Sequence, residues 1–425
     1  MGSTNTLLNP SVIAKEALML LENNLVMGNL VHRRYVNEFK KVGGSVSIRK
    51  PVKFRVTKAR TRTNSTITEN SITLSVATQA HVSWAFNTKD LTLSIEEYSE
   101  RYIRPAAAAL ANTVDADICS LYDDVFNSVN ESTGFITPES FIVLGKAAQK
   151  MDEEACPPED RSIALNPAAN WALANALKSL YVQDAAGGAL RGGVAQGGPP
   201  KGYRGTIAGF DIYMDQNIKT HTTGQYHESG STAALKAQTA GTTGLLASDK
   251  KGISMIDFKI VNTKVLRVGD VFTIAGVFAV NPMSGESTGQ LRQFTVTADA
   301  SCAVTETTSA GAVTVYFEPA LIDTGPYATV DTTPAASAVV TIVGSINEPY
   351  PQNLAFHKNA FALVTVPLEM PSGIWGARET HNGLSIRIVK DYDIDADDEV
   401  ARLDILYGVK TLYPELAARI WGAEG

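Results

Sequence analysis

Positive charge is concentrated in one part of this chain, and this constrains what the chain can fold into more than any other feature. Eleven of the 37 Lys and Arg residues lie in Arg33–Arg62, where Glu38 is the only acid. Because the 425 residues carry a formal charge of −7, the remainder of the chain carries about −17. The basic segment therefore needs phosphates, acidic lipids or an acidic protein surface, and the rest of the same protein offers such a surface.

Hydrophobic periodicity predicts that the basic segment forms a long β-hairpin. After Gly43-Gly44, apolar residues alternate with Ser, Arg and Lys, which is the period of a strand exposed on one face: Val46, Ile48, Val52, Phe54 and Val56. A second alternating stretch, Ile72, Leu74 and Val76, follows a polar tip at Thr61–Asn70. The tip has almost nothing to bury, so we expect an exposed arm.

Four stretches of the first half combine helical periodicity with residues that start helices. Ser11 is the expected N-cap of the first stretch. Pro105 suits the first turn of the second, an Ala-rich stretch with one apolar stripe over about 23 residues, roughly 35 Å. The expected helices are Ser11–Met27, Pro105–Val125, Thr137–Met151 and Asn166–Leu180.

The middle of the chain loses this helical character. Gly187–Gly205 holds eight glycines and two prolines, which predicts a mobile loop, and the polar stretch Thr220–Thr243 is typical of a linker. From Val268 to His357 the only Lys or Arg is Arg292. Short Val, Thr and Phe alternations in this region predict a small antiparallel β-barrel or sandwich inserted into a larger fold. Its expected strands include Val271–Ile274, Phe294–Val296, Val313–Phe317 and Val339–Val343.

The last eighty residues or so return to mixed character. We expect strands at Phe361–Val366, Leu384–Val389 and Leu403–Val409, with an acidic turn at Asp391–Glu399. A chain of this length exceeds what one hydrophobic core normally serves, which predicts two or three subdomains. Apolar and charged contents of 44% and 19% describe a folded globular protein.

No segment of the sequence predicts a membrane span, a secretory signal or a disulfide framework. No apolar run approaches the roughly 20 residues that a bilayer requires. The first apolar stretch, Ala17–Leu21, is bounded by acids and makes a poor signal, so we expect a cytoplasmic start. The three cysteines, Cys119, Cys156 and Cys302, are far apart, and we interpret them as reduced.

Two short motifs have catalytic or metal-binding parallels. Gly285–Gly289 matches the G-x-S-x-G elbow of serine hydrolases around Ser287, but the motif needs a strand before it and a helix after it, whereas here a strand follows. Asp391, Asp393 and Asp395 begin like a calcium loop. The sixth and twelfth positions, Ala396 and Arg402, exclude an EF-hand. For Gly285–Gly289 we favour an ordinary turn. For the aspartates we favour a solvated acidic turn, with a looser cation site between subunits as the alternative.

The glycine-rich loop and the histidines give weaker signals. Gly187–Gly205 lacks both glycine-rich phosphate-binding fingerprints, which favours a flexible connection. The six histidines show no metal-ligand spacing, and two of them, His221 and His227, lie in the polar linker. We therefore predict no metal site and no cofactor. For the basic hairpin, the density of cations favours nucleic acid, whereas the pI near 5.5 and the scarcity of aromatic residues favour an acidic protein neighbour.

Several stretches, taken in their order along the chain, carry a family resemblance. The resembling stretches are Ile103–Asp115, Glu139–Glu153 followed by Leu165-Asn166-Pro167, Ile207–Asp211, Val268–Val277, Leu354–Leu363 and Ile386–Ile420. Together they resemble the major capsid proteins of tailed double-stranded DNA bacteriophages, which have the Hong Kong 97-type fold. Within that family the chain is most similar to coat proteins of short-tailed phages that carry an inserted β-barrel.

The resemblance implies an α+β fold with five parts. These are an N-terminal arm, an extended β-hairpin loop, a peripheral domain with a long spine helix, an axial domain and an inserted all-β domain. The implied boundaries are residues 1–42 for the arm, 43–92 for the loop, 93–151 and 381–425 for the peripheral domain, 152–224 and 346–380 for the axial domain, and 225–345 for the insertion. The family often has Arg before the late Pro, where this chain has Tyr413.

The resemblance also implies a function that is structural and not enzymatic. It implies a homo-oligomer of hexamers and pentamers that closes into an icosahedral shell around phage double-stranded DNA, which it contacts without sequence specificity. Scaffolding protein and a portal are implied partners, and the implied location is the virion capsid, assembled in the host bacterial cytoplasm without a membrane. Because no Lys–Asn crosslinking pair is identifiable, we expect noncovalent assembly.

The placement of the basic hairpin before the spine helix favours a clamp between subunits. We expect its cations to contact the acidic turn of a neighbouring subunit. The expected intersubunit residues are Arg49, Lys50, Lys53, Arg55, Lys58, Arg60, Arg62, Asp391, Asp393, Asp395, Asp397 and Asp398. Alternatives are a cellular nanocompartment shell, a tail-associated carbohydrate-binding β protein, which the lack of Trp in Val268–Ser345 disfavours, and a serine hydrolase acting through Ser287.

Overall fold

The structure is a computed structural model of the whole chain. The residues that it describes are 10–35, 44–56, 58, 60–61, 69–87, 102–131, 138, 140–174, 203–225, 235–238, 245–246, 251–258, 265–301, 311–335, 338–394 and 398–422. Most of the predicted glycine loop, the Cys302 thiol and part of the predicted linker lie outside these residues. Among the described residues, no helix is both long and apolar enough to cross a bilayer.

Two N-terminal helices pack against one long helix. Helix α1 (Pro10–Asn24) and the short α2 (Met27–Leu30) lie beside α5 (Arg104–Cys119). The first helix begins at Pro10, so the prediction of Ser11 as its N-cap is wrong; the fixed φ of proline suits a first turn. The apolar stripes predicted for both helices are buried in a common core, including Leu18 and Leu110.

The long helix is shorter than the sequence predicts. It ends at Cys119 and tightens into the 3-10 helix η2 (Ser120–Asp124). Ser and Asp side chains compete for backbone hydrogen bonds and weaken an α-helix interior. The Ser120 hydroxyl does so directly, donating to the Asp117 carbonyl at 2.6 Å. The apolar stripe nevertheless stays buried to Val125.

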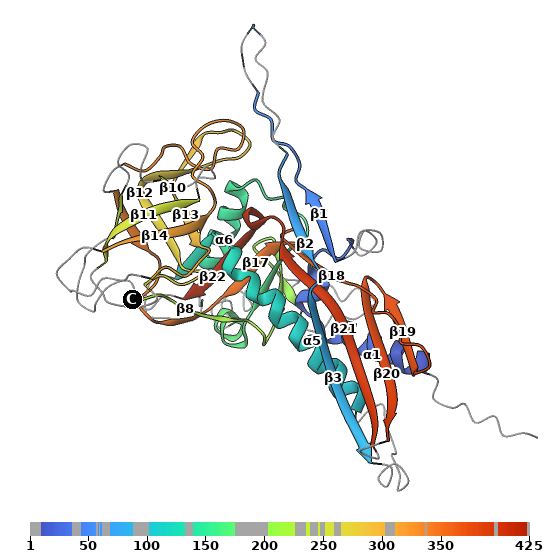
Figure 1. Ribbon diagram of the computed structural model, residues 1–425. Helices are drawn as coiled ribbons and strands as arrows, with labels where there is room; N and C mark the ends of the chain where they lie inside the picture. Colours follow the sequence, from blue (N-terminus) through green and yellow to red (C-terminus); the bar gives the residue numbers. More distant parts are fainter. Residues whose placement is uncertain are drawn as a thin grey trace, which may run out of the picture.

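A five-stranded sheet lies against these helices. Strand β21 (Asp398–Thr411) is its centre and pairs with β3 (Thr78–Asn87), β20 (Leu384–Asp393) and β18 (Phe361–Thr365), while β19 (Trp375–His381) is paired outside β20. Helices α1 and α5 cover one face, and the strands extend together toward one end of the molecule (Figure 1). The strands predicted here are confirmed, with Leu403, Ile405 and Tyr407 fully buried.

A six-stranded sheet forms the middle of the molecule. Its order is β4 (Ser128–Glu131), β22 (Ala417–Gly422), β17 (Asn353–His357), β5 (Arg161–Leu165), β7 (Phe210–Met214) and β6 (Tyr203–Ile207). Helix α6 (Phe141–Glu153) packs on β22 and β4. It begins later than predicted, because Ser140 is the N-cap and accepts from the Ile142 amide. A further helix at residues 167–174 begins as predicted, capped by the Asn166 side chain.

The predicted β-rich region forms a separate seven-stranded sheet with its own core. Its strands are β9 (Leu235–Gln238), β10 (Leu245–Leu246), β11 (Gly252–Phe258), β12 (Val271–Val280), β13 (Ser287–Val296), β14 (Gly311–Glu318) and β15 (Ala338–Ile342). Because β9 pairs with both β15 and β11, six of these strands close into a ring. Three phenylalanine rings stack at its centre: Phe272, Phe294 and Phe317. We call this unit the barrel.

The predicted linker is partly wrong, because two strands occupy its described part. Strand β8 (Thr220–Thr222) pairs with β16 (Pro349–Pro351), and β9 belongs to the barrel. The chain thus enters and leaves the barrel through two adjacent antiparallel strands. This stretch has no apolar alternation, so periodicity could not indicate its short strands.

Within the described residues, the predicted basic hairpin is paired at its base alone. Strand β1 (Ser45–Arg49) runs antiparallel to β2 (Ser71–Ser75), with Val46, Ile48 and Leu74 buried. The prediction that the strand continues to Val56 is wrong: residues 51–56 are described without regular structure. Pro51 has no N–H to donate to a ladder, so pairing ends after the Lys50 amide bonds to Asn70 at 2.7 Å.

Candidate functional site

The basic arm, defined here as residues 49–62, holds its described cations in solvent. Arg49 pairs with Glu69 at 3.3 Å, but both side chains are more than half exposed. The Lys50 ammonium lies 5.0 Å from the centre of the Tyr413 ring. Tyr413 therefore presents a ring face to this cation. Lys53, Arg55, Lys58 and Arg60 are exposed, and Arg62 lies outside the described residues.

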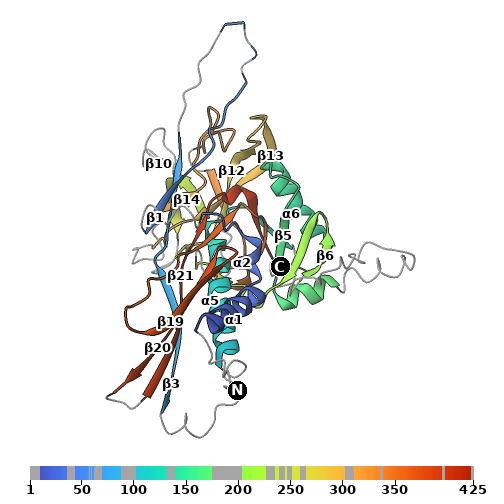
Figure 2. The same cartoon turned by 90° about the vertical axis from the view of Figure 1, so that its right-hand side faces the viewer.

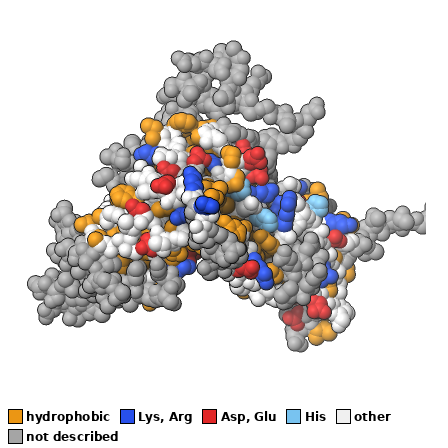
Figure 3. Space-filling model, turned by 90° about the horizontal axis from the view of Figure 1, so that it is seen from above, with side chains coloured by type: hydrophobic (Ala, Val, Ile, Leu, Met, Phe, Trp, Pro, Cys, Tyr) orange, Lys and Arg blue, Asp and Glu red, His pale blue; other side chains and the backbone are white. Residues whose placement is uncertain are grey.

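The arm rests on the barrel of its own chain. The Lys53 amide donates to the Tyr327 hydroxyl at 3.3 Å. The Arg55 guanidinium lies against Gly285, where a Cβ would collide with it, and Gly285 has a positive φ of +75°. Seen from above, Lys and Arg side chains lie among hydrophobic ones across the middle of the molecule (Figure 3). The arm thus leaves the molecule in a direction that the barrel helps to set.

The acidic residues predicted to meet the arm lie on a β-hairpin. Asp391 and Asp393 belong to β20 and Asp398 to β21, with Asp393 opposite Asp398. Asp395 and Asp397 lie outside the described residues. An antiparallel hairpin is not a calcium-loop geometry, and among the described residues no group of three potential metal ligands occurs.

The described residues of the arm and of the acidic hairpin do not meet within one chain. The arm leaves one end of the molecule, and β20 and β21 run to the opposite end (Figures 1 and 2). The expected contact between them is therefore open only to two copies of the chain.

A buried polar cluster joins the barrel to the rest of the molecule, and sequence reasoning missed it. The His221 side chain, interpreted as part of a polar linker, is only 6% exposed. Its Nε2 lies 2.8 Å from Asp270 Oδ1 at the start of β12, and its Nδ1 lies 3.2 Å from the Tyr122 hydroxyl of η2. Asp270 also accepts from the backbone amides of Gly224 and Arg267. One carboxylate thus ties the end of the entrance strand β8 to the loop that precedes β12.

Arg419 occupies the centre of this cluster. Its guanidinium, on β22, donates to the Gly269 carbonyl at 2.7 Å and to the Thr295 hydroxyl at 3.3 Å. It also lies 5.8 Å from the centre of the Tyr122 ring. Burial lowers the pKa of Arg419 to about 10, although the negative charge of Asp123 acts in the opposite direction. Burial also raises the pKa of Asp123. Burial of such a charge is tolerated because acceptors from three segments surround it.

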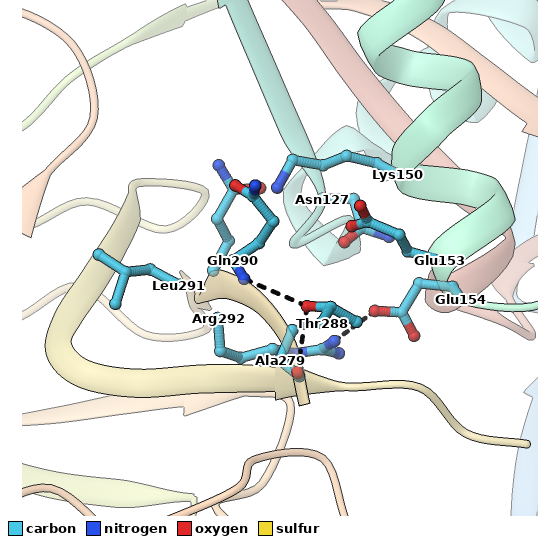
Figure 4. A pocket seen from close by; sticks show the side chains of 10 residues that line it. Asn127, Lys150, Glu153, Glu154, Ala279, Thr288, Gln290, Leu291 and Arg292 are labelled. Atoms are coloured by element: carbon cyan, nitrogen blue, oxygen red, sulfur yellow. Dashed lines mark hydrogen bonds and ion pairs between the residues drawn. The ribbon is translucent and has the colours of Figure 1, made fainter. Parts of the chain in front are cut away.

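A second polar contact fixes the same face of the barrel. Arg292 of β13 forms a buried ion pair with Glu154, next to the end of α6, and lies 4.5 Å from the centre of the Phe126 ring. The neighbouring Gln293 side chain accepts from the Ser128 amide at 2.8 Å and donates to the Ser128 carbonyl at 2.9 Å. Figure 4 shows the small pocket between β13 and α6, with Lys150 and Glu153 on the helix side. Burial lowers the pKa of Lys150.

One signal in the sequence pointed to this contact. Arg292 is the only Lys or Arg between Val268 and His357, and a lone cation in a stretch whose other charged residues are all acidic indicates a specific partner. No comparable signal marked His221 or Arg419, whose partners are distant along the chain. We call the two groups together the junction: Tyr122, Asp123, His221, Asp270, Arg419, Arg292, Glu154 and Gln293.

The candidate catalytic serine lies in a turn. Ser287 starts β13 and pairs with Val280 of β12, so Gly285–Gly289 is part of a β-hairpin and not a strand–turn–helix. The Ser287 hydroxyl accepts only weakly, from the Gly289 amide at 3.4 Å. The interpretation as an ordinary turn is confirmed.

Comparison with known proteins identifies the family. The family model described as P22 coat protein, gene protein 5, matches residues 2–420. The chain belongs to the P22 coat protein family. The resemblance to tailed-phage capsid proteins, inferred from the order of segments, is thereby confirmed. A major capsid protein of Acyrthosiphon pisum secondary endosymbiont phage 1 is 30% identical over 121 residues, which span 28% of this chain and 29% of that protein.

Solved structures also match. The capsid structure of the cyanophage P-SCSP1u covers 94% of this chain and 89% of its own, with 12% identity and a TM-score of 0.47. The CUS-3 coat protein I-domain is 31% identical, covering 27% of this chain and 98% of its own, with a TM-score of 0.18. The assignment to the family rests on the family model, which extends over nearly the whole chain.

Proposed function

We propose that this chain is the major capsid protein of a tailed phage, whose copies assemble into the icosahedral shell that encloses double-stranded DNA. Membership of the P22 coat protein family carries this proposal. The exposed arm and the distant acidic hairpin support it, because surfaces of opposite charge at opposite ends of one chain suit repeated association. The role is structural: binding between copies does the work, without catalysis or a cofactor.

The fold proposed for this role is of the Hong Kong 97 type with an inserted domain. In this assignment residues 1–42 are the N-terminal arm and 43–92 the extended loop. Residues 93–151 with 381–425 are the peripheral domain, and α5 is its spine. Residues 152–224 with 346–380 are the axial domain, and 225–345 are the insertion. The separate core of the barrel and the adjacent entrance strands β8 and β16 support the last boundary.

The proposed partners follow from the shell. Copies of the chain form hexamers and pentamers held by noncovalent contacts. A scaffolding protein and a portal act during assembly in the host bacterial cytoplasm, and packaged DNA is contacted without sequence specificity. The intersubunit contacts involve the cations of the basic arm and the acids of the β20–β21 hairpin, and the described members of these two groups do not contact one another within one chain.

A nanocompartment shell of the same architecture is the second candidate. A structural protein that encloses protein cargo would use the same charge-segregated arm, so the arm does not separate the two. Family membership favours the phage shell.

The decisive experiment is assembly in vitro. The purified chain is concentrated at several salt concentrations, alone and after co-expression with candidate cargo, and viewed by negative-stain electron microscopy. Closed particles are expected, and their absence under all conditions argues against a shell protein. Nucleic acid or protein inside particles purified from the native source distinguishes a phage shell from a nanocompartment.

A further inference from the structure

The acidic hairpin carries an open pocket that is partly aromatic. A cavity of about 340 Å³ is lined by Gly373, Ile374, Trp375, Lys390, Asp391, Tyr392 and Glu399. Trp375 and Tyr392 are 40% and 50% exposed, although large aromatic side chains are normally covered. Next to them Ile394 is 81% exposed. We call this site the aromatic pocket.

The charge of the pocket is negative on balance. Its only cation, Lys390, is already engaged: it forms an ion pair with Glu399 and lies 5.7 Å from the centre of the Trp375 ring. Asp391 also lines the pocket, and Asp393 lies two residues further along β20. An apolar side chain flanked by cations therefore suits this pocket.

The basic arm presents side chains of that kind. Phe54 and Val56 are 69% and 85% exposed, and they alternate with Lys53 and Arg55. Burying a large apolar side chain that is now in water favours association. The arm is held in place while it does so, since Lys53 and Arg55 contact the barrel at Tyr327 and Gly285. Because the segment is already held against its own barrel, it loses less conformational entropy when it binds.

The two surfaces lie too far apart to combine within one chain, as Figures 1 and 2 show. A contact that uses different patches on its two partners leaves one arm and one pocket free on the pair. Such head-to-tail contacts continue from copy to copy and close into a ring when the rotation permits. This is the type of contact that rings of subunits require.

Resting on the proposed function, we propose that the aromatic pocket receives Phe54 and Val56 of a second copy of this chain. The flanking cations of the arm then lie beside Asp391 and Asp393. In this arrangement the apolar residues provide most of the affinity, and the charges orient the two copies and raise their rate of association.

Photocrosslinking in assembled particles tests the proposal directly. The full chain is produced with benzoylphenylalanine in place of Phe54, assembled, irradiated and digested for mass spectrometry. We expect crosslinks between this position and the peptide around Trp375 and Tyr392, appearing as covalent dimers and larger ladders. Particles that form but crosslink elsewhere overturn the pocket and leave the shell function standing. If the wild-type chain forms no particles, the shell function itself fails.

Substitutions give a second and independent readout. Phe54→Ala and Trp375→Ala should each raise the concentration required for assembly about tenfold or more, as expected for buried aromatic anchors. Ile142→Ala, which truncates a 64% exposed residue of α6, is the matched control and should change it little. Equal effects of all three variants contradict the proposal.

A charge swap tests whether Arg55 of one copy pairs with Asp391 of another. Arg55→Glu and Asp391→Arg should each weaken assembly, and the double variant should recover most of the loss, because the pair is restored in reverse. Losses that simply add in the double variant argue against this pairing. Unfolding of the unassembled variants in urea shows whether any effect comes from the fold and not from the contact.

Discussion

The basic arm and the junction use cations in opposite ways. The arm has many Lys and Arg side chains in solvent, and few of them have a partner in their own chain. The junction has two buried arginines, and each donates to at least one acceptor and lies against an aromatic ring. Exposed ion pairs contribute little to stability, whereas removing one member of a buried pair is costly. Cations of the arm are therefore available for assembly, and those of the junction maintain the orientation of the barrel.

The largest expected effect is at Arg419. Replacing it with Met removes hydrogen bonds to Gly269 and Thr295 and leaves the half-buried Asp123 without its cation. We expect a loss of about 3–5 kcal/mol in the free energy of unfolding, measured in urea on the unassembled chain. Lys410→Met, at an exposed position, is the control and should cost less than about 0.5 kcal/mol. A small effect at Arg419 would break the distinction between the two regions.

The next largest loss of stability is expected at Arg292. Arg292→Ala should destabilise the chain by about 3 kcal/mol, because Glu154 stays buried without its partner. The double variant Arg292→Ala with Glu154→Ala should recover part of that loss, which a double-mutant cycle measures. Additive losses would show that the two side chains contribute separately and not as a pair.

Asp115 sharpens the comparison, because it is a buried acid without a cation. Its oxygens accept from the Val26 and Gly28 amides at 2.7 and 2.8 Å, and so attach the N-terminal helices to α5. Burial outweighs these bonds and raises its pKa from 3.8 to about 7. Between these values the folded chain binds more protons than the unfolded chain, so stability from this group is present below pH 3.8 and is lost as pH rises toward 7.

The pH dependence of stability tests this expectation for Asp115. The free energy of unfolding should fall with rising pH by up to about 1.4 kcal/mol per unit through this window, in addition to the contributions of other groups. Asp115→Asn should remove this part of the slope. An unchanged slope in the variant shows that Asp115 titrates alike in both states.

The smallest effect on stability is expected in the arm. Arg55→Glu with Arg60→Glu should change the free energy of unfolding by less than about 0.5 kcal/mol, since both residues are exposed. The same variant should impair shells, and assembly of the wild type should weaken with added salt because screening acts on exposed charges. Normal shells from this variant would favour nucleic acid as the partner of the arm.

Local patterns allowed much of the fold to be predicted. Apolar stripes located α1, α5 and α6, and alternation located β21 and four of the barrel strands, β12 to β15, because a buried face leaves a period in the sequence. The errors lie where partners override local preference. Pro51 ended β1 early, Ser120 and the Asp residues after it tightened the end of α5, and β8 and β9 formed in a stretch without apolar alternation.

The sequence by itself determined the segregation of charge, the order of segments and the family to which they point. Only the tertiary structure decided that His221, Asp270, Tyr122 and Arg419 meet, since they come from four segments far apart in the chain. Only the tertiary structure also separated the arm from the acidic hairpin by the length of the molecule. Composition and period record what each segment buries, whereas distances between segments depend on how the sheets and helices pack.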